Sequence, residues 1–115
     1  MRILLIALLL TGCAAFDDSD MVRLEQPAEA NRCVAWLMDE DVMPVPSIVY
    51  AEEMPWLPEH GFVNGYYDPD SDTVVVHRRF NQAPILLHEI SHAYGATERA
   101  ADSVERRGRD CVSFG

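Results

Sequence analysis

The chain has 115 residues, of which 49% are hydrophobic, and its 19 acidic and 9 basic residues give a formal net charge of −10. This length and apolar content suit one compact globular domain, and they exclude a multidomain or polytopic membrane protein. Binding nucleic acid requires a basic face that displaces counterions, so the acidic balance excludes nucleic acid as a partner.

The N-terminal residues have the pattern of a signal peptide. Arg2 supplies a basic start, residues 3–10 are an unbroken apolar stretch, and small residues precede Cys13. Such a segment is a targeting signal and not part of the fold. The sequence Leu-Thr-Gly-Cys at 10–13 resembles the lipobox of bacterial lipoproteins, which implies that residues 1–12 are removed and that Cys13 is lipidated. The alternative is an ordinary signal peptide or short membrane anchor that contains a cysteine.

The resemblance to lipoproteins also implies a location. Ala14, and not an aspartate, follows the cysteine, which implies a lipid anchor in the outer membrane of a bacterial cell, facing the periplasm or the exterior. We expect residues 13–25 to be the lipidated cysteine and a solvated acidic tether, and residues 26–115 to be the folded domain. The oligomeric state stays open.

The cysteine count supports export. With Cys13 assigned to the lipid, Cys33 and Cys111 remain as an even pair, and exported chains oxidise such pairs. We therefore predict a disulfide between them. The alternative is that they are two unrelated buried thiols.

The first half of the folded part begins with a predicted helix. Residues 27–40 place apolar side chains at helical spacing behind a proline that suits a first turn. Residues 42–58 are rich in proline, which predicts an extended or looped segment with strand character only at 47–50. We expect Trp56 and Leu57 to cover a core edge.

Two β-prone runs, residues 61–67 and 73–77, are joined by an Asp-Pro-Asp-Ser-Asp connector and predict an antiparallel hairpin. The connector starts like a calcium-binding loop. However, Thr73 stands where that loop has glycine and Arg79 where it has glutamate, so we reject calcium binding there.

Two helices complete the predicted elements. Pro84 opens a helix that continues through apolar residues to Gly95, a suitable C-cap. Thr97 is a good N-cap for a last helix that ends near Gly108. Helices and a small hairpin together predict an α+β fold.

The helix after Pro84 carries His88-Glu89-Ile90-Ser91-His92, an H-E-x-x-H pattern. Residues four apart lie on one helix face about 5–6 Å from each other, so both imidazoles can reach one zinc ion. Glu89 lies off that line and can act as the base on a water at the metal. The alternative is that the two histidines only solvate or cap the helix.

This helix and the hairpin before it, about residues 61–105, resemble the zincin metallopeptidases. The resemblance implies a small zincin-like domain, in which an antiparallel hairpin or sheet packs on the active-site helix and a C-terminal helix, with one more helix at the N-terminus. It also implies Zn²⁺ as the cofactor and a peptide or protein as the substrate.

Two zincin subfamilies offer a third ligand, and both nominate Glu98. Residues 88–98 have the metzincin spacing, with glutamate in place of the final histidine or aspartate. Residues 98–102 resemble the E-x-x-A-D segment of gluzincins, in which the glutamate binds zinc and the aspartate supports a ligand histidine. We prefer the gluzincin-like interpretation because no methionine follows Glu98, although the gap from His92 is shorter than in most gluzincins. Asp102 is then the supporting partner, and it is the substitute ligand if Glu98 fails.

The resemblance thus predicts zinc on His88, His92 and Glu98, with Glu89 as the general base of peptide hydrolysis. Residues 73–77 are the expected edge strand for an extended substrate, unless they form an ordinary core strand. The sequence does not select an oxyanion stabiliser among Tyr67, His77 and Tyr94. The alternative function is a non-catalytic zincin-like lipoprotein that serves as a binding or envelope-assembly module.

Overall fold

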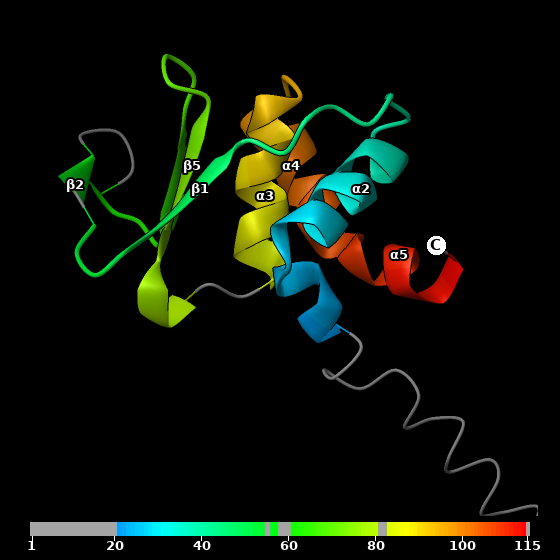
Figure 1. Cartoon of the computed structure of the whole chain (residues 1–115), viewed down its shortest axis with the longest axis horizontal. Helices are drawn as coiled ribbons and strands as arrows, with labels where there is room; N and C mark the ends of the chain where they lie inside the picture. The colour runs from blue at the N-terminus through cyan, green and yellow to red at the C-terminus, as the bar shows by residue number, and fades with distance from the viewer. Residues whose placement is uncertain (1–20, 55, 58–60, 81–82, 115) are drawn as a thin grey trace, which may run out of the picture.

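The computed structural model describes residues 21–54, 56–57, 61–80 and 83–114. The predicted signal peptide, Cys13 and the first part of the predicted tether lie outside the described residues. The fold is α+β, with helices packed against one face of a small mixed sheet (Figure 1). Within the described part of the chain, no helix has the length and apolar character needed to cross a membrane.

The folded part begins before the predicted boundary at residue 26. A 3-10 helix, η1 (Met21–Glu25), places Leu24 in the core with 3% of its surface exposed. The predicted tether therefore ends before residue 25, because the apolar side chain of Leu24 is buried in the core. Helix α2 (Pro27–Leu37) follows, with the proline in its first turn. It ends before the predicted residue 40.

The main sheet has three strands in the order β1-β5-β4. Strand β1 (Ser47–Ala51) lies parallel to β5 (Thr73–His77), and β4 (Gly65–Asp68) lies antiparallel to it. The predicted hairpin is therefore confirmed for β4 and β5.

The first β-prone run is divided into two strands. Its beginning is β3 (Gly61–Phe62), which pairs with β2 (Trp56–Leu57) in a separate antiparallel ribbon. The predicted core contact of Trp56 and Leu57 concerns side chains outside the described part.

The prediction that residues 73–77 form an edge strand is wrong. Strand β5 is paired on both sides, and its Val74 and Val76 are fully buried against the helices. A run of valines suits a strand with neighbours on both sides, and β1 provides the second neighbour through a parallel pairing. Among the described strands of this sheet, β1 and β4 are the two edges.

Three helices follow the sheet. After a single 3-10 turn, η2 (Arg78–Phe80), come α3 (Ala83–Ala93) and α4 (Glu98–Arg106). Gly95 has φ of 90°, and the N–H groups of Gly95 and Ala96 donate to the carbonyls of His92 and Ser91, which is a Schellman cap. The Thr97 hydroxyl accepts from the Ala100 N–H at 3.2 Å, which confirms the N-cap.

A short helix, α5 (Gly108–Phe114), was not predicted. The sequence suggests that Gly108 ends a helix, yet this glycine begins one. A Cβ atom at Gly108 would lie 2.6 Å from Cδ1 of Leu87, so the glycine permits close packing of α5 on α3.

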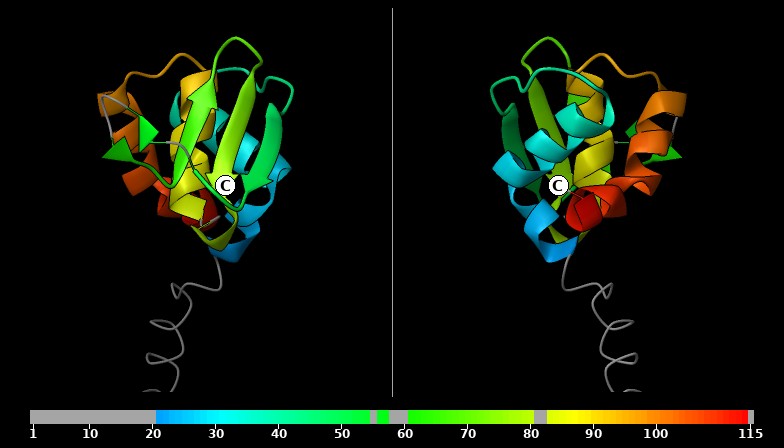
Figure 2. Two further views of the ribbon diagram at one scale, coloured as in Figure 1. Left: turned by 90° about the vertical axis from the view of Figure 1, so that its left-hand side faces the viewer. Right: turned by 90° about the vertical axis from the view of Figure 1, so that its right-hand side faces the viewer.

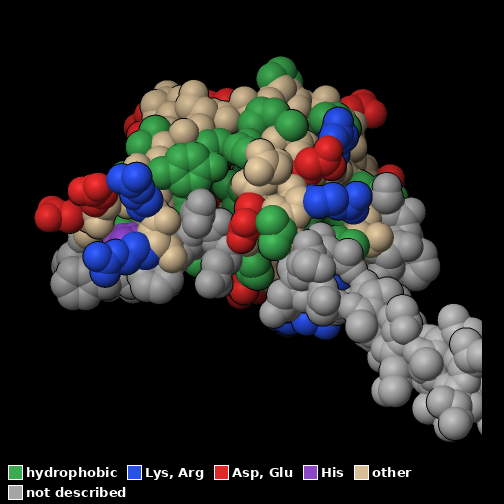
Figure 3. Space-filling view, turned by 60° about the horizontal axis from the view of Figure 1, so that its bottom comes forward, with side chains coloured by type: hydrophobic (Ala, Val, Ile, Leu, Met, Phe, Trp, Pro, Cys, Tyr) green, Lys and Arg blue, Asp and Glu red, His purple; other side chains and the backbone are tan. Residues whose placement is uncertain are grey.

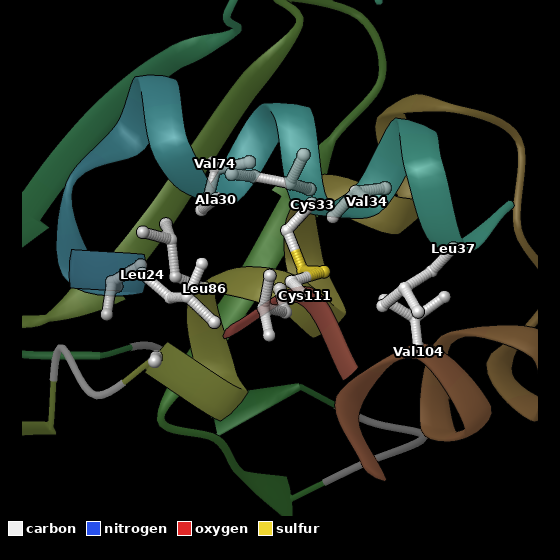
Figure 4. Packing of buried hydrophobic residues seen from close by; sticks show 13 residues of the cluster. Leu24, Ala30, Cys33, Val34, Leu37, Val74, Leu86, Val104 and Cys111 are labelled. Carbon is white, nitrogen blue, oxygen red and sulfur yellow. A yellow bond between two sulfur atoms is a disulfide. The ribbon is translucent and has the colours of Figure 1, made fainter. Parts of the chain in front are cut away.

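The core lies between the sheet and the helices and is joined by a disulfide (Figure 4). Its largest fully buried side chains include Leu86, Leu87 and Ile90 of α3. The predicted pairing of Cys33 with Cys111 is confirmed, with an S–S distance of 1.96 Å and 5.6 Å between the Cα atoms. This bond fastens α5 to α2 across 78 residues of sequence.

Candidate metal centre

Helix α3 presents His88 and His92 on the side that faces away from the core. Its apolar side is filled by buried leucine and isoleucine, so the 3.6-residue period turns His88 and His92 together toward the opposite side. The two imidazole rings lie edge to face, with centroids 5.1 Å apart. Both rings are therefore close enough to share one ligand.

The tight turn at Gly95 brings α4 back beside α3 and places Glu98 between the two rings. Oε1 of Glu98 lies 2.7 Å from Nε2 of His92, and Oε2 lies 3.3 Å from Nε2 of His88. The structure thus brings together the three residues that the sequence nominates as metal ligands.

The other nitrogen of each ring has its own acceptor. Nδ1 of His92 lies 2.8 Å from the carbonyl oxygen of Ala96, and Nδ1 of His88 lies 3.0 Å from Oε1 of Glu105. In a neutral imidazole the nitrogen that meets an acceptor carries the hydrogen, so Nε2 keeps the lone pair. Each ring thus has an acceptor at Nδ1 and a Glu98 oxygen at Nε2. Metal-binding histidines are commonly held by a partner on one nitrogen, which leaves the other nitrogen, here Nε2, for the metal.

Sequence analysis missed Glu105. It nominated Asp102 as the supporting partner, whose Oδ1 lies 3.4 Å from Nδ1 of His88, longer than the 3.0 Å to Glu105. A signal was present in the sequence, because Glu98, Asp102 and Glu105 are spaced four and three residues apart and share one face of α4.

Changing Glu105 should weaken zinc binding more than changing Asp102. In Glu105→Gln the acceptor on Nδ1 of His88 loses its charge, and loss of such a partner typically lowers metal affinity about 10- to 100-fold. Asp102→Asn should have a smaller effect because its contact is longer. Zinc competition with a chromophoric chelator measures both, with Asp110→Asn as the control on α5. A larger loss in Asp102→Asn would show that the sequence-based choice of partner is the correct one.

Glu89 is the buried carboxylate of the site, with 9% of its surface exposed. No described residue hydrogen-bonds to its carboxylate, and it lines the cleft described below. Desolvation raises the pKa of Glu89, and the nearby Glu98 and Glu105 raise it further, against the opposing effect of His88 and His92. Its pKa therefore lies above the ordinary value.

Glu98 has the opposite shift. Partial desolvation acts to raise its pKa, but the charges of His88 and His92 and the hydrogen bonds from both rings act to lower it. The net effect is a pKa below the ordinary value. Glu98 is thus ionised at neutral pH, the form in which a carboxylate binds a metal.

The residues fit a zinc ion by the chemistry of their donor atoms. Imidazole nitrogen and carboxylate oxygen are zinc ligands, and two histidines with one glutamate are a known catalytic set that leaves a position open. Candidate donor atoms of His88, Glu89 and His92 also lie within 4.8 Å of one another. Glu98 is a better candidate for a third ligand than Glu89, because Glu98 contacts both Nε2 atoms.

A cleft of about 770 Å³ opens over these residues. Helix α3 forms its floor, and β4 and α4 form its two walls, with α4 on the β4 side of the sheet and β1 on the other side (Figure 2). Gly65 of β4 permits this arrangement, because a Cβ there would lie 3.0 Å from Cγ2 of Ile85 and 3.2 Å from Cγ of Glu89. The sheet edge at Gly65 and the side chain of Glu89 are thus in close contact.

Two of the oxyanion candidates use their hydroxyls elsewhere. The Tyr67 hydroxyl donates to Oδ1 of Asp72 at 2.7 Å, and this bond, with desolvation, raises the pKa of Tyr67 to about 12. The Tyr94 hydroxyl donates to Oδ1 of Asn31 and accepts from the N–H of Met43, both at 3.0 Å, and so links α3 to α2 and the loop after it. His77 accepts from the N–H of Arg79 at the end of β5.

Comparisons with protein-family models, with curated proteins and with solved structures found no match. The chemistry of the site therefore follows from its own residues. Those residues are two imidazoles and a carboxylate that meet at one point, with a second, buried carboxylate beside them.

Proposed function

We propose that the chain is a small zinc-dependent metallopeptidase of the zincin type, anchored to a membrane by a lipid on Cys13. The observation that carries the proposal is the contact of both Nε2 atoms with the Glu98 carboxylate, while each Nδ1 is held by another acceptor. Two imidazoles held at Nδ1, whose Nε2 atoms converge on one carboxylate, form a site suited to a divalent ion.

His88, His92 and Glu98 would hold the ion. One carboxylate neutralises one of its two positive charges, so the ion stays a useful Lewis acid. When bound, zinc supplies polarisation of the scissile carbonyl and a lowered pKa for water at the open position.

Glu89 is suited to be the general base. It lies one residue after His88 on the cleft floor, and its carboxylate has no hydrogen-bond partner among the described residues that would compete for a proton. It accepts a proton from the attacking water and returns it to the leaving amine.

The open edge of β4 is suited to bind the substrate. Residues 65–68 line the cleft directly beside the base. An extended peptide could join this edge by main-chain hydrogen bonds, with its scissile bond above α3. The proposal thus transfers the substrate-binding role from β5 to β4.

Metal content is the first test of the proposed function. Elemental analysis of the full-length chain in detergent should find about one zinc per wild-type chain, and almost none in His92→Ala or Glu98→Ala, because each variant loses one of three ligands. Glu40→Ala, an acidic residue in the loop after α2, is the matched control and should keep its zinc.

Two results would count against the peptidase. A wild-type chain without zinc after reconstitution would contradict the metal site. One zinc per chain without hydrolysis of any peptide in a library would favour the alternative, a non-catalytic module of the cell envelope.

A further inference from the structure

The charged side chains of the cleft are of one sign. Apart from the two histidines, the charged residues that line it are Asp68, Glu89, Glu98 and Glu105. None of the arginines in the described part of the chain lines this cleft, and the chain has no lysine. Among the described residues, the charged side chains of the cleft other than the two histidines are therefore all carboxylates.

The arginines are placed elsewhere. Arg78 pairs with Glu52 at 3.0 Å, and Arg107 lies 3.7 Å from a carboxylate oxygen of Asp110. Arg106 and Arg109 line a separate hollow beside η1. Figure 3 shows arginine and acidic side chains interspersed on the face turned up from the bottom of Figure 1, in contrast to the uniform charge of the cleft.

A bound metal does not reverse this charge. A divalent ion adds two positive charges to a cleft lined by four carboxylates, so the sum stays negative, and Asp102 adds a further negative charge beside His88. Asp68 and Glu105 are not metal ligands in the proposed site, and Glu105 also lies 3.0 Å from Nδ1 of His88. They lie on opposite walls, Asp68 on β4 and Glu105 on α4.

The wall formed by β4 carries an oriented carboxylate and aromatic side chains. The Asp68 carboxylate accepts from the N–H of Asp70 at 3.1 Å and from the Ser71 hydroxyl at 2.9 Å, which fixes its orientation at the end of the strand. Tyr66 and Tyr67 line the cleft beside it. A carboxylate next to an aromatic ring is a favourable environment for an arginine or lysine side chain.

We propose that the peptide accepted by this cleft is cationic, with an arginine or lysine close to the scissile bond and its charge held between Asp68 and Glu105. Cleavage of this cationic peptide rests on the proposed function, whereas its binding to the cleft does not. The acidic chain as a whole strengthens the attraction, because its net charge steers basic peptides toward the cleft and repels acidic ones.

The first measurement is binding without cleavage. The zinc-loaded, full-length Glu89→Gln chain in detergent is titrated with fluorescent peptides that differ only in one residue, which is arginine, norleucine or glutamate. The arginine peptide should bind about tenfold tighter than the glutamate peptide. The preference should shrink as salt rises, because salt screens charges that face solvent.

Asp68→Asn and Asp70→Asn form a matched pair. Both remove one negative charge from the same hairpin, but only Asp68 lines the cleft, and an asparagine there can still bond to Asp70 and Ser71. Asp68→Asn should lower the preference for arginine about two- to fivefold, the range for an exposed ion pair. Asp70→Asn should leave it unchanged. An equal loss in both variants would mean that only net charge matters and would overturn the proposed subsite.

Cleavage by the wild-type chain separates the two proposals. Hydrolysis of arginine, norleucine and glutamate peptides with equal kcat/KM would overturn the inference and leave the peptidase intact. Selective binding of the arginine peptide with no hydrolysis would overturn the peptidase and leave the cationic preference intact.

Discussion

Replacing Glu89 by glutamine should abolish most peptide hydrolysis and leave zinc binding unchanged. General acid–base catalysis by a positioned carboxylate contributes about 10²- to 10⁴-fold to a rate, and glutamine cannot accept the proton. The side chain keeps its shape, and Glu89 does not contact the metal ligands as Glu98 does. We expect kcat to fall by about that factor, with zinc per chain the same as in the wild type.

The Glu89→Gln chain should also be at least as stable as the wild type. Burial raises the pKa of Glu89, so the folded chain holds this proton more tightly than the unfolded chain does. Above the ordinary pKa of glutamate, ionised Glu89 therefore opposes folding, and a neutral glutamine removes that cost. Thermal unfolding of both chains at neutral pH, without metal, measures the difference.

Glu89→Asp is the conservative control for activity. It keeps a carboxylate, withdrawn by one methylene, so it should retain more activity than Glu89→Gln. Hydrolysis by Glu89→Gln at the wild-type rate would show that another group is the base, and the proposed mechanism would then be wrong.

Removing the disulfide should have the largest effect on stability. The bond joins residues 78 apart in sequence, and closing a loop of that length is worth about 4 kcal/mol of unfolding free energy in the chain-entropy model. Both cysteines are buried, so the double variant Cys33→Ala/Cys111→Ala avoids placing a hydroxyl in the core. Chemical denaturation of the two chains should show this loss.

The response to reductant is the control for this experiment. A reducing agent should lower the midpoint of the wild-type chain toward that of the double variant, and it should not change the variant. A loss below about 1 kcal/mol would show that α5 is held by its packing on α3 and α2 rather than by the bond. In that case Gly108, which packs against Leu87, would be the residue to test next.

The sequence by itself determined the local features of this protein. The positions of α2, α3 and α4, the caps at Gly95 and Thr97, and the two histidines on one helix face all follow from interactions between residues close in sequence. The pairing of Cys33 with Cys111 followed from counting, because only two cysteines remained for the folded domain.

Only the tertiary structure decided which strand is exposed and which groups meet at the site. Alternation assigns the faces of a strand but does not name its neighbours, so the parallel pairing of β1 with β5, and the open edge of β4, could not be predicted. Glu105 contacts His88 because of the position along α3 at which α4 packs. Helical periodicity shows which residues share a face of α4, but it does not select the turn that makes the contact. These outcomes depend on long-range packing, which no short stretch of sequence contains.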